Sequence, residues 1–447
     1  MSSCERKTFF DMPLNPSFVH PITDFPPHEY FETSEEFVAL IVPVSRVATL
    51  RKALRHVMLD RPKVKSIYPA DCDPLYRKLI LADSKSSLND PIVQQLLNEN
   101  NTGFDSSINL TTHVLQRSYD DWSVDEVLQA LLPCDEIPSS FESVGPIAHV
   151  NLREEWLPFQ YIIGKVLLDK NKPRIRYVVH KEGPIDTTYR TFGMKIIANL
   201  DSEKDWSIVT LREEGCRFTL DFQQVYWNSR LAGEHRRLVQ EIRSSDQSHT
   251  QESVVVADVM AGIGPFSIPL TSANSQSVTR PCLVYANDLN PYSYEYLNIN
   301  AKQNRCNNLN MYNMDGRSFI RLLQESKVEF HHAIMNLPAS APEFLDAFRG
   351  FSGDTLPKVH VYCFAPKSSS IDGYAESIAR CELSLGCKIH NPCVHLVRDV
   401  SPKKNMLCIS FDLPELVRSL ERIKTMESTE LSSPNTKRAK TDHPTQI

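Results

Sequence analysis

Four polar residues in the C-terminal half of the chain follow predicted β-strands at intervals typical of strand–helix units. They are Asp258 in VVVADVMAG, Asp288 in VYANDLNP, Asp315 in NMDGRSF and Asn336 in AIMNLP, separated by 30, 27 and 21 residues. A parallel sheet binds ligands outside the carboxyl ends of its strands, so these groups are expected side by side. Carboxylates and an amide in such a row can bind the hydroxyls and the base of a nucleoside.

A tight glycine turn follows the first of these strands, in the segment Ala261-Gly262-Ile263-Gly264-Pro265. Glycines let a ligand approach the backbone closely, although an ordinary structural turn would have the same composition. The turn lacks the third glycine of dinucleotide-binding sites and the GK[ST] of phosphate-binding loops. Asp288 lies 24 residues beyond Gly264, where an acid can bind ribose hydroxyls. S-adenosylmethionine, a nucleoside with a carboxylate tail, suits this turn and the helix N-terminus after it.

The expected cofactor site takes residues from all four junctions: Asp258, Ala261, Gly262, Gly264, Pro265, Asp288, Leu289, Asp315, Gly316 and Asn336. Asp315 is expected to bind an adenine amino group, with an exposed loop aspartate as an equally weighted alternative. Asn336 and Pro338 form the segment Asn-Leu-Pro, which at a strand end can hydrogen-bond a planar base along its edge. Taken alone, this segment is also a common turn.

Arg230 and Glu234 precede the sheet in the segment VYWNSRLAGEHRR. Their spacing of four residues places both on one face of a helix. One interpretation is a surface ion pair, which would contribute little to stability. The other is an acid–base pair above a substrate, with Tyr226 or Trp227 stacked on that substrate and the other aromatic residue buried in a core.

The chain has 447 residues, a formal net charge of −6 and 11 cysteines, none of them in a CxxC pair. Nucleic-acid binders are usually basic, yet residues 164–195 carry eight Lys or Arg against three Asp or Glu. This basic run could bind a phosphate backbone or be a solvated face. The unpatterned cysteines favour reduced thiols inside the cell. The segment CKIHNPCVH contains the ligand types of zinc sites but has no second cluster, so no metal is expected.

The alternation of strands and helices predicts an α/β fold in several domains. We expect an N-terminal arm and small α/β domain at 1–105, and a mixed α+β domain at 106–228 that begins with the strand THVLQRSY. Residues 229–424 are expected to form a parallel sheet with helices on both faces, ending in the strand MLCISFDL. Residues 425–447 are polar and are expected to be a disordered tail. Ser123 and Glu126 predict a capping box at one helix of the second domain.

Taken together, DVMAGIGPF, VYWNSRLAGEHRR, NDLNP, MNLP and the upstream segment GPIAHVNLREEWLPFQYIIGKVLLDKN resemble the eukaryotic and archaeal tRNA (guanine-37-N1)-methyltransferases. The resemblance covers roughly residues 110–415. It implies a class I (Rossmann-like) S-adenosylmethionine-dependent methyltransferase sheet with two smaller N-terminal RNA-binding domains, acting on tRNA with guanosine at position 37. Separately, we expect the protein to be a monomer. By this resemblance Glu234 is the general base, Arg190 and Arg230 lie near the target guanine, and Asn336 and Pro338 hold its edge.

This chemistry requires a base, because guanine N1 carries a proton at neutral pH that must leave as the methyl group arrives. One alternative is the related wybutosine-pathway transferase, which moves an aminocarboxypropyl group from the same cofactor. Another is an RNA-binding scaffold without activity, against which the complete set of polar residues argues. The expected compartments are cytoplasm and nucleus, with the mitochondrial matrix as an alternative. Lys437-Arg438-Ala-Lys440 is a candidate nuclear signal.

Overall fold

The structure is a computed structural model that describes residues 28–71, 73–99, 108–133, 136–183, 189, 193–202, 205–244, 253–273, 281–367 and 372–422. Arg190, most of the expected N-terminal arm, the expected tail and its candidate nuclear signal lie outside the described residues. The chain forms two compact units, one of residues 1–213 and 217–232 and the other of residues 214–216 and 233–447. In the part of the chain that the structure describes, no helix has the length and apolarity needed to cross a membrane.

The first unit begins with a sheet whose described strands have the order β2-β3-β1-β4. The strands are β1 (Thr33–Pro43), β2 (Ile67–Pro69), β3 (Tyr76–Ile80) and β4 (Asn109–Arg117), and the helices beside them are α1 (Val47–Ala53), α2 (Ser84–Leu88) and α3 (Pro91–Glu99). The sequence analysis placed the last of these strands in the second domain. The structure corrects this, because β4 pairs antiparallel with β1 along nine residue pairs, from Thr33–Arg117 to Ile41–Asn109. The first sheet therefore ends after residue 117 and not near 105.

A second described sheet of the first unit has the order β5-β6-β7-β8. Its strands are β5 (Glu142–Val144), β6 (Ile147–Val150), β7 (Tyr177–Glu182) and β8 (Gly193–Asn199), and it is accompanied by α4 (Val124–Leu131), α5 (Gln160–Asn171) and the strands β9 (Ile208–Glu213) and β10 (Cys216–Asp221). The predicted capping box at α4 is confirmed, since Ser123 Oγ accepts from the Glu126 N–H and the Glu126 carboxylate accepts from the Ser123 N–H.

The second unit contains a sheet with the order β13-β12-β11-β14-β15-β17-β16 among the described strands. The strands are β11 (Val254–Asp258), β12 (Cys282–Asn287), β13 (Leu309–Tyr312), β14 (His332–Met335), β15 (Lys358–Pro366), β16 (Cys393–Ser401) and β17 (Lys404–Asp412). Strands β11 to β15 pair in parallel, and β17 runs antiparallel to both of its neighbours. The predicted α/β sheet is thus confirmed, with an antiparallel strand near one edge.

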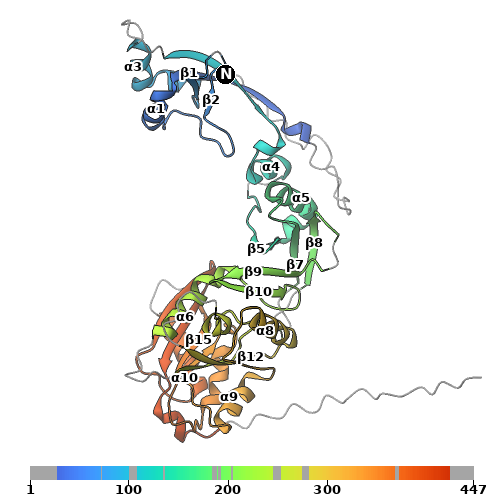
Figure 1. Ribbon diagram of the computed structural model, residues 1–447, viewed down its shortest axis with the longest axis vertical. Coiled ribbons are helices and arrows are strands. Elements are labelled where there is room, and N and C mark those ends of the chain that lie inside the picture. The colour runs from blue at the N-terminus through green and yellow to red at the C-terminus, as the bar shows by residue number, and fades with distance from the viewer. Residues whose placement is uncertain are drawn as a thin grey trace, which may run out of the picture. The chain divides into compact units, whose positions relative to one another are not determined.

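The helices of the second unit are α6 (Ala232–Ser244), α7 (Ser267–Thr271), α8 (Pro291–Gln303), α9 (Gly316–Glu325) and α10 (Asp372–Leu385). In Figure 1, α8, α9 and α10 lie around the strands labelled β12 and β15. A continuous core joins the sheet to α9 and α10 through fully buried side chains such as Phe319, Met335 and Leu407. Burial on this scale holds the strand ends in place, because each large apolar side chain contributes about 1.5–3 kcal/mol when removed from water.

Strand β16 was not among the expected strands, the last of which, MLCISFDL, corresponds to β17. Its first four residues pair regularly with β17, with His395 opposite Cys408 and Leu396 opposite Leu407. Register shifts follow between Leu396 and Arg398 and again between Asp399 and Ser401. The irregular pairing is therefore confined to the end of β16 that is far from Cys393.

Candidate active site

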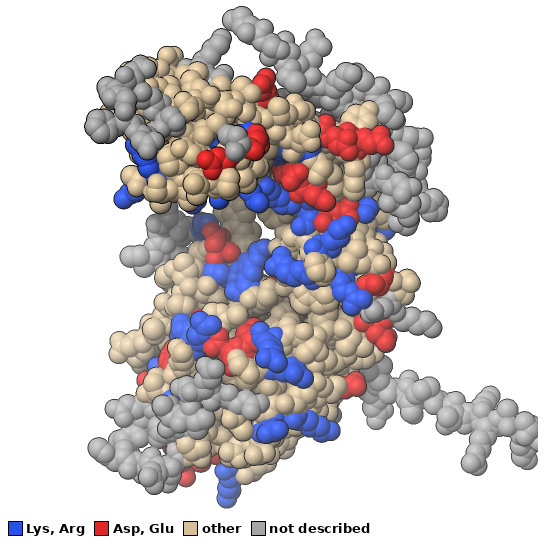
Figure 2. Space-filling view, turned by 45° about the horizontal axis from the view of Figure 1, so that its top comes forward, with Lys and Arg blue, Asp and Glu red and all other residues tan. Residues whose placement is uncertain are grey.

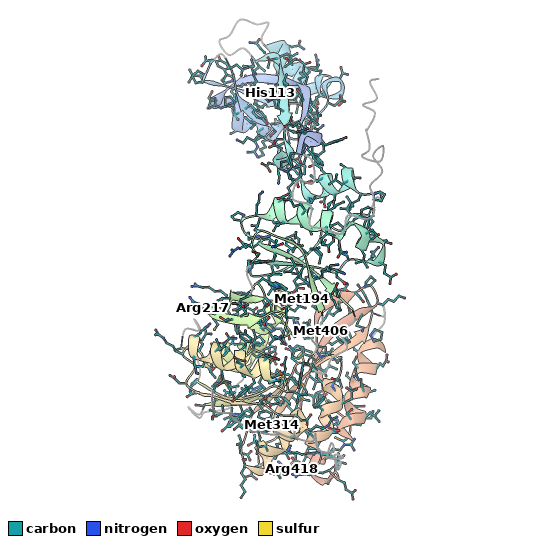
Figure 3. The ribbon with its side chains drawn as sticks, turned by 90° about the vertical axis from the view of Figure 1, so that its right-hand side faces the viewer. His113, Met194, Arg217, Met314, Met406 and Arg418 are labelled. Atoms are coloured by element: carbon teal, nitrogen blue, oxygen red, sulfur yellow. The ribbon has the colours of Figure 1, made fainter. Side chains whose placement is uncertain are left out.

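One buried amide joins the ends of three neighbouring strands. Asn287, the last residue of β12, donates from Nδ2 to the carbonyl oxygens of Val259 (3.1 Å) and Met314 (3.0 Å), which follow β11 and β13. Its Oδ1 accepts from the N–H of Met314 (3.0 Å), and its carbonyl accepts from the N–H of Ala261 (2.7 Å). Met314 is labelled in Figure 3. Since buried polar groups are stable only when hydrogen-bonded, Asn287 fixes the strand-to-loop junctions side by side.

The glycine turn after β11 combines a packed glycine with one that faces open space. Gly262 and Gly264 have positive φ angles of 56° and 97°, a conformation that glycine adopts without strain. A Cβ atom on Gly264 would lie 2.6 Å from Ile268 Cγ1, so packing requires glycine there. A Cβ atom on Gly262 would meet nothing within 4 Å, which leaves the backbone open to a ligand. Pro265 follows directly and leads into α7.

Asp258 is the last residue of β11, and only one oxygen of its buried carboxylate accepts a hydrogen bond from a described residue. Its Oδ2 accepts a hydrogen bond from Ser267 Oγ (2.6 Å), while Oδ1 has no hydrogen-bond partner among the described residues. Burial raises the pKa of Asp258 to about 7, with a smaller contribution from the charge of Asp288. A buried oxygen without a partner beside an open glycine turn fits a ligand that brings a hydrogen-bond donor and a positive charge. The amino and sulfonium groups of S-adenosylmethionine carry such charge.

Asp288 also supports the glycine turn directly. Its Oδ2 accepts from the N–H of Gly262 (2.8 Å), and its Oδ1 accepts from the N–H of Asn290 (2.9 Å). Burial raises the pKa of Asp288, and these two hydrogen bonds oppose the rise. An ionised carboxylate has about four acceptor positions, so capacity for ribose hydroxyls remains after these contacts.

Asp315 is not the exposed loop aspartate that was the alternative interpretation. It is the N-cap of α9, and its Oδ1 accepts from the N–H groups of Arg317 (2.9 Å) and Ser318 (3.1 Å). Its Oδ2 makes no hydrogen bond to a described residue and can serve a ligand. Gly316 is buried behind this cap, and Leu289 remains 43% exposed at the neighbouring junction.

The segment Asn336-Leu337-Pro338 after β14 is a turn that leaves its asparagine side chain available. The carbonyl of Leu337 accepts from the N–H of Ser340 (2.9 Å), and the carbonyl of Pro338 accepts from the N–H of Phe364 on β15 (3.1 Å). The amide of Asn336 is half-buried and forms no hydrogen bond with a described residue. The turn therefore fixes the backbone and leaves one amide for a base edge.

Glu234 is a buried residue of α6 rather than half of a surface ion pair. Arg237 binds it with two parallel hydrogen bonds, from Nε to Oε2 and from Nη2 to Oε1, each 2.7 Å long. Tyr362 on β15 donates to Oε1 over 2.8 Å, and Nε2 of His395 on β16 lies 3.3 Å from Oε2. The hydrogen bonds to Glu234 raise the pKa of Arg237 further above its ordinary value. The arginine that pairs with Glu234 is thus Arg237, which the sequence analysis did not select.

The side chains below Glu234 come from one row across the antiparallel part of the sheet. Tyr362 on β15 and His395 on β16 both lie opposite Cys408 on β17, and directly opposed residues share one face of a sheet. Burial raises the pKa of Tyr362 well above its ordinary value and that of Cys408 to about 12. Both groups stay protonated at neutral pH. Met406, labelled in Figure 3, is on the same strand as Cys408.

The residues just before α6 divide as the sequence analysis expected. Trp227 is buried, with its ring 5.5 Å from that of Phe218, whereas Tyr226 is exposed. Arg230 is also exposed, and its backbone N–H donates to Asn228 Oδ1 (3.0 Å). Tyr226 is therefore the one of the two aromatic residues that can stack on a ligand.

The basic run at 164–195 is less uniform than its composition suggests. Several of its cations bind neighbours within the first unit: Lys165 with Asp169 (2.9 Å), Arg176 with Asp201 (2.6 Å) and Lys170 with the carbonyl of Tyr119. Lys172 is exposed and lies 3.5 Å from Asp169, and Arg174 is exposed. Figure 2 shows Lys and Arg interspersed with Asp and Glu over the visible surface. The run thus offers Lys172 and Arg174, rather than all of its members, to a phosphate backbone.

No three His, Cys, Asp or Glu side chains of the described residues are grouped so that they could hold a metal ion. The segment 387–395, whose composition suggested zinc ligands, is among the residues described. Within it Cys393 and His390 are exposed, and His395 faces Glu234.

Comparison with known families gives two matches within the chain. Residues 209–389 match the model of the TRM5/TYW2 methyltransferase domain, and residues 124–199 match that of the TYW2 N-terminal domain. Two solved structures share the fold. One is wild-type Trm5b from Pyrococcus abyssi, with a TM-score of 0.58 and 24% identity over 84% of this chain and 99% of that one. The other is described as the complex structure of aTrm5 and tRNALeu, with a TM-score of 0.57 and 19% identity over 84% of this chain and 100% of that one.

Several curated proteins are similar along most of their length. A protein of Phaeodactylum tricornutum named tRNA (guanine(37)-N(1))-methyltransferase 1 is 49% identical over 96% of this chain and 97% of its own. Proteins named tRNA (guanine(37)-N(1))-methyltransferase from Schizosaccharomyces pombe and Danio rerio are 40% and 36% identical, over 86% and 89% of this chain and 92% and 83% of theirs.

Proposed function

The chain belongs to the tRNA (guanine(37)-N(1))-methyltransferases of the TRM5/TYW2 family, and from this premise we propose which of its residues carry the reaction. It transfers a methyl group to N1 of guanosine 37 in tRNA. We propose that Glu234 is the general base for N1. The observation that carries this assignment is the buried carboxylate of Glu234, held by Arg237 and Tyr362 in one fixed position.

S-adenosylmethionine supplies the methyl group as a sulfonium, so that the departing sulfur is neutral. The residues of this chain that would hold it lie at the ends of β11 to β14. Asp288 has acceptor capacity for the ribose hydroxyls, and Oδ2 of Asp315 has capacity for the adenine amino group. The unpartnered Oδ1 of Asp258 suits the positively charged part of the molecule. Further members of this site are Ala261, Gly262, Gly264, Pro265, Leu289, Gly316 and Asn336.

Glu234 would take the N1 proton as the new bond to carbon forms, so that no positive charge develops on the guanine ring in the transition state. Negative charge develops toward O6 of guanine, and a guanidinium stabilises such charge. Arg190 and Arg230 are proposed for this role from their sequence motifs. Asn336, with its available amide, and Pro338 would hold the edge of the base. Tyr226 would stack on it after it leaves the anticodon stack.

The wybutosine-pathway aminocarboxypropyl transferase was the nearest alternative. The relatives at 36–49% identity along most of the chain favour methyl transfer instead. The mass of the product separates the two reactions. A methyl group adds about 14 Da to the nucleoside, whereas an aminocarboxypropyl group adds much more.

The test of the base is Glu234→Gln, which keeps the side-chain length but cannot accept a proton at neutral pH. The single-turnover rate on tRNA with guanosine at position 37 should fall by about 10²–10⁴-fold, while cofactor and tRNA affinity stay near normal. Gln removes a charge beside Arg237, so folding is checked by circular dichroism and cofactor binding before the rates are compared. A folded variant with the wild-type single-turnover rate would exclude Glu234 as the base.

We also propose a monomer that acts in the cytoplasm and nucleus, with the mitochondrial matrix as the alternative. The scattered cysteines, eight of which are free among the described residues, support a reducing compartment. Light scattering of the purified protein would test the monomer. Imaging of the tagged protein, with and without Lys437 and Arg438, would test the compartment.

A further inference from the structure

The carboxylate of Glu234 is held by hydrogen bonds at all but one of its acceptor positions. An ionised carboxylate has about four acceptor positions. Among the described residues, Arg237 and Tyr362 fill three of them with hydrogen bonds of 2.7 to 2.8 Å. The fourth, on Oε2, receives no hydrogen bond from a described residue and is free to take a proton, and Nε2 of His395 lies 3.3 Å from the same oxygen. His395 is thus the most loosely held of the three neighbours.

His395 also differs from the other neighbours in its access to water. Its side chain is 43% exposed, whereas that of Glu234 is 4% exposed and Tyr362 is fully buried. Arg237 cannot release its proton in a protein, and Tyr362 keeps its phenolic proton because burial raises its pKa. The imidazole of His395 is the neighbour that can both accept a proton and exchange it with solvent.

A proton that stayed on Glu234 would disrupt the pair with Arg237. Protonation removes the negative charge that the Arg237 guanidinium binds with two hydrogen bonds. Arg237 would keep its second partner, Glu241, through Nη1 (2.6 Å), but its Nε and Nη2 groups would lose the charge that they bind. Moving the proton to His395 restores the carboxylate and puts the positive charge on an exposed ring.

We propose that His395 accepts from Oε2 of Glu234 the proton that guanine N1 loses, and that it releases this proton to water. The inference rests on the proposed role of Glu234 and adds the route by which the proton leaves. The N1–H bond breaks as an O–H bond forms on Glu234 and the methyl carbon bonds to N1. The O–H bond then breaks as Nε2 of His395 binds the proton, and the imidazolium returns it to solvent. His395 acts through Glu234 and need not touch the base.

The test compares three variants with the wild-type protein in single turnovers on tRNA transcripts with guanosine at position 37. His395→Gln keeps a hydrogen-bonding side chain but cannot take up a proton, and its rate should fall by about 10- to 100-fold. His395→Ala should fall similarly and recover when imidazole is added, because free imidazole can occupy the vacated space. The control is His390→Gln, an exposed histidine five residues away on the same segment, which should have the wild-type rate.

Two results would overturn the proposal. A wild-type rate in His395→Gln would show that a hydrogen bond at this position is sufficient. A folded His395→Ala variant whose rate imidazole does not restore would show that His395 contributes packing and not proton transfer. Glu234→Gln, measured alongside, separates this failure from failure of the general base. A slow Glu234→Gln with a fast His395→Gln rejects only the proton route, whereas a fast Glu234→Gln rejects the base and the route together.

Discussion

The phenol of Tyr362, on strand β15, donates a hydrogen bond of 2.8 Å to Oε1 of Glu234 on helix α6, across 128 residues of sequence. Because burial holds the pKa of Tyr362 well above its ordinary value, the phenol donates this bond and does not accept it. The position of the proposed base is therefore set by the sheet as well as by its own helix.

Tyr362→Phe should remove one of the two hydrogen bonds that Oε1 of Glu234 accepts and leave the one from Arg237 Nη2. Hydrogen bonds to charged groups contribute about 1.5–3 kcal/mol, so the free energy of unfolding should fall by about that amount. The measurement is urea denaturation followed by circular dichroism, since the four tryptophans of the chain lie outside the unit that contains Tyr362. Tyr285→Phe, on β12, is the matched control, since its hydroxyl makes no hydrogen bond to a described residue and its removal should cost little. Equal stability of Tyr362→Phe and wild type would show that the bond contributes nothing.

Asp258 should make the stability of the ligand-free protein depend on pH. Its pKa is about 7 in the folded state against an ordinary 3.8, so the folded state holds a proton that the unfolded chain has lost. Between about pH 4 and pH 7 the free energy of unfolding should therefore fall as pH rises. Asp258→Asn removes this dependence, keeps an acceptor for Ser267, and should exceed the wild type in melting temperature near pH 8.

Calorimetry across this pH range checks the prediction, with Asp412→Asn, an exposed aspartate on β17, as control. The same Asp258→Asn variant should bind S-adenosylmethionine more weakly, because it lacks the negative charge. A parallel pH dependence in wild type and Asp258→Asn would contradict the assignment.

Asp288→Ala should weaken S-adenosylmethionine binding by about 1.5–3 kcal/mol, the contribution of hydrogen bonds to a charged group. The structure adds a second expectation, because Asp288 also accepts from the backbone N–H groups of Gly262 and Asn290. Some loss of thermal stability should accompany the loss of affinity. Isothermal calorimetry, at a temperature where the variant is folded, measures its affinity for S-adenosylmethionine. Unchanged affinity would show that Asp288 does not bind the cofactor.

Neutralising Lys172 and Arg174 together should weaken tRNA binding and reduce its salt dependence, because each phosphate contact releases a counterion. Neutralising Lys165 and Arg176 should affect folding stability more than tRNA affinity, since both hold aspartates at 2.6–2.9 Å, closer than the 3.5 Å between Lys172 and Asp169. Filter binding between low and moderate salt distinguishes the two pairs. If neutralising Lys172 and Arg174 left the salt dependence of tRNA affinity unaltered, these two residues would not contact the phosphate backbone.

The sequence was sufficient to predict the strand-end groups, because period and spacing are local properties that place Asp258, Asp288 and Asn336 after successive parallel strands. The same reasoning missed Asn287, whose neighbour Asp288 attracted the functional interpretation. The available signal was an asparagine at the end of an apolar strand, one residue before Asp288, where a buried amide needs hydrogen-bond partners.

The support of Glu234 could not be predicted in the same way. Arg237 stood three residues away and was overlooked in favour of Arg230, since both spacings fit one helix face. Tyr362 and His395 reach Glu234 only through the pairing of β15, β17 and β16, and no local pattern reports such long-range contacts. Strand β16 itself was missed, and β4 was assigned to the wrong sheet because alternation does not identify a strand's partner.

The regular start of β16 has a consequence for insertions and deletions. Side chains alternate between the two faces of a strand, so a shift of one residue between Cys393 and Leu396 would turn His395 away from Glu234 and put an aliphatic neighbour in its place. The same shift beyond Leu396 would fall among the existing bulges, which already accommodate an extra residue. Length variation among related chains should therefore be tolerated toward the β16–β17 turn and excluded near Cys393.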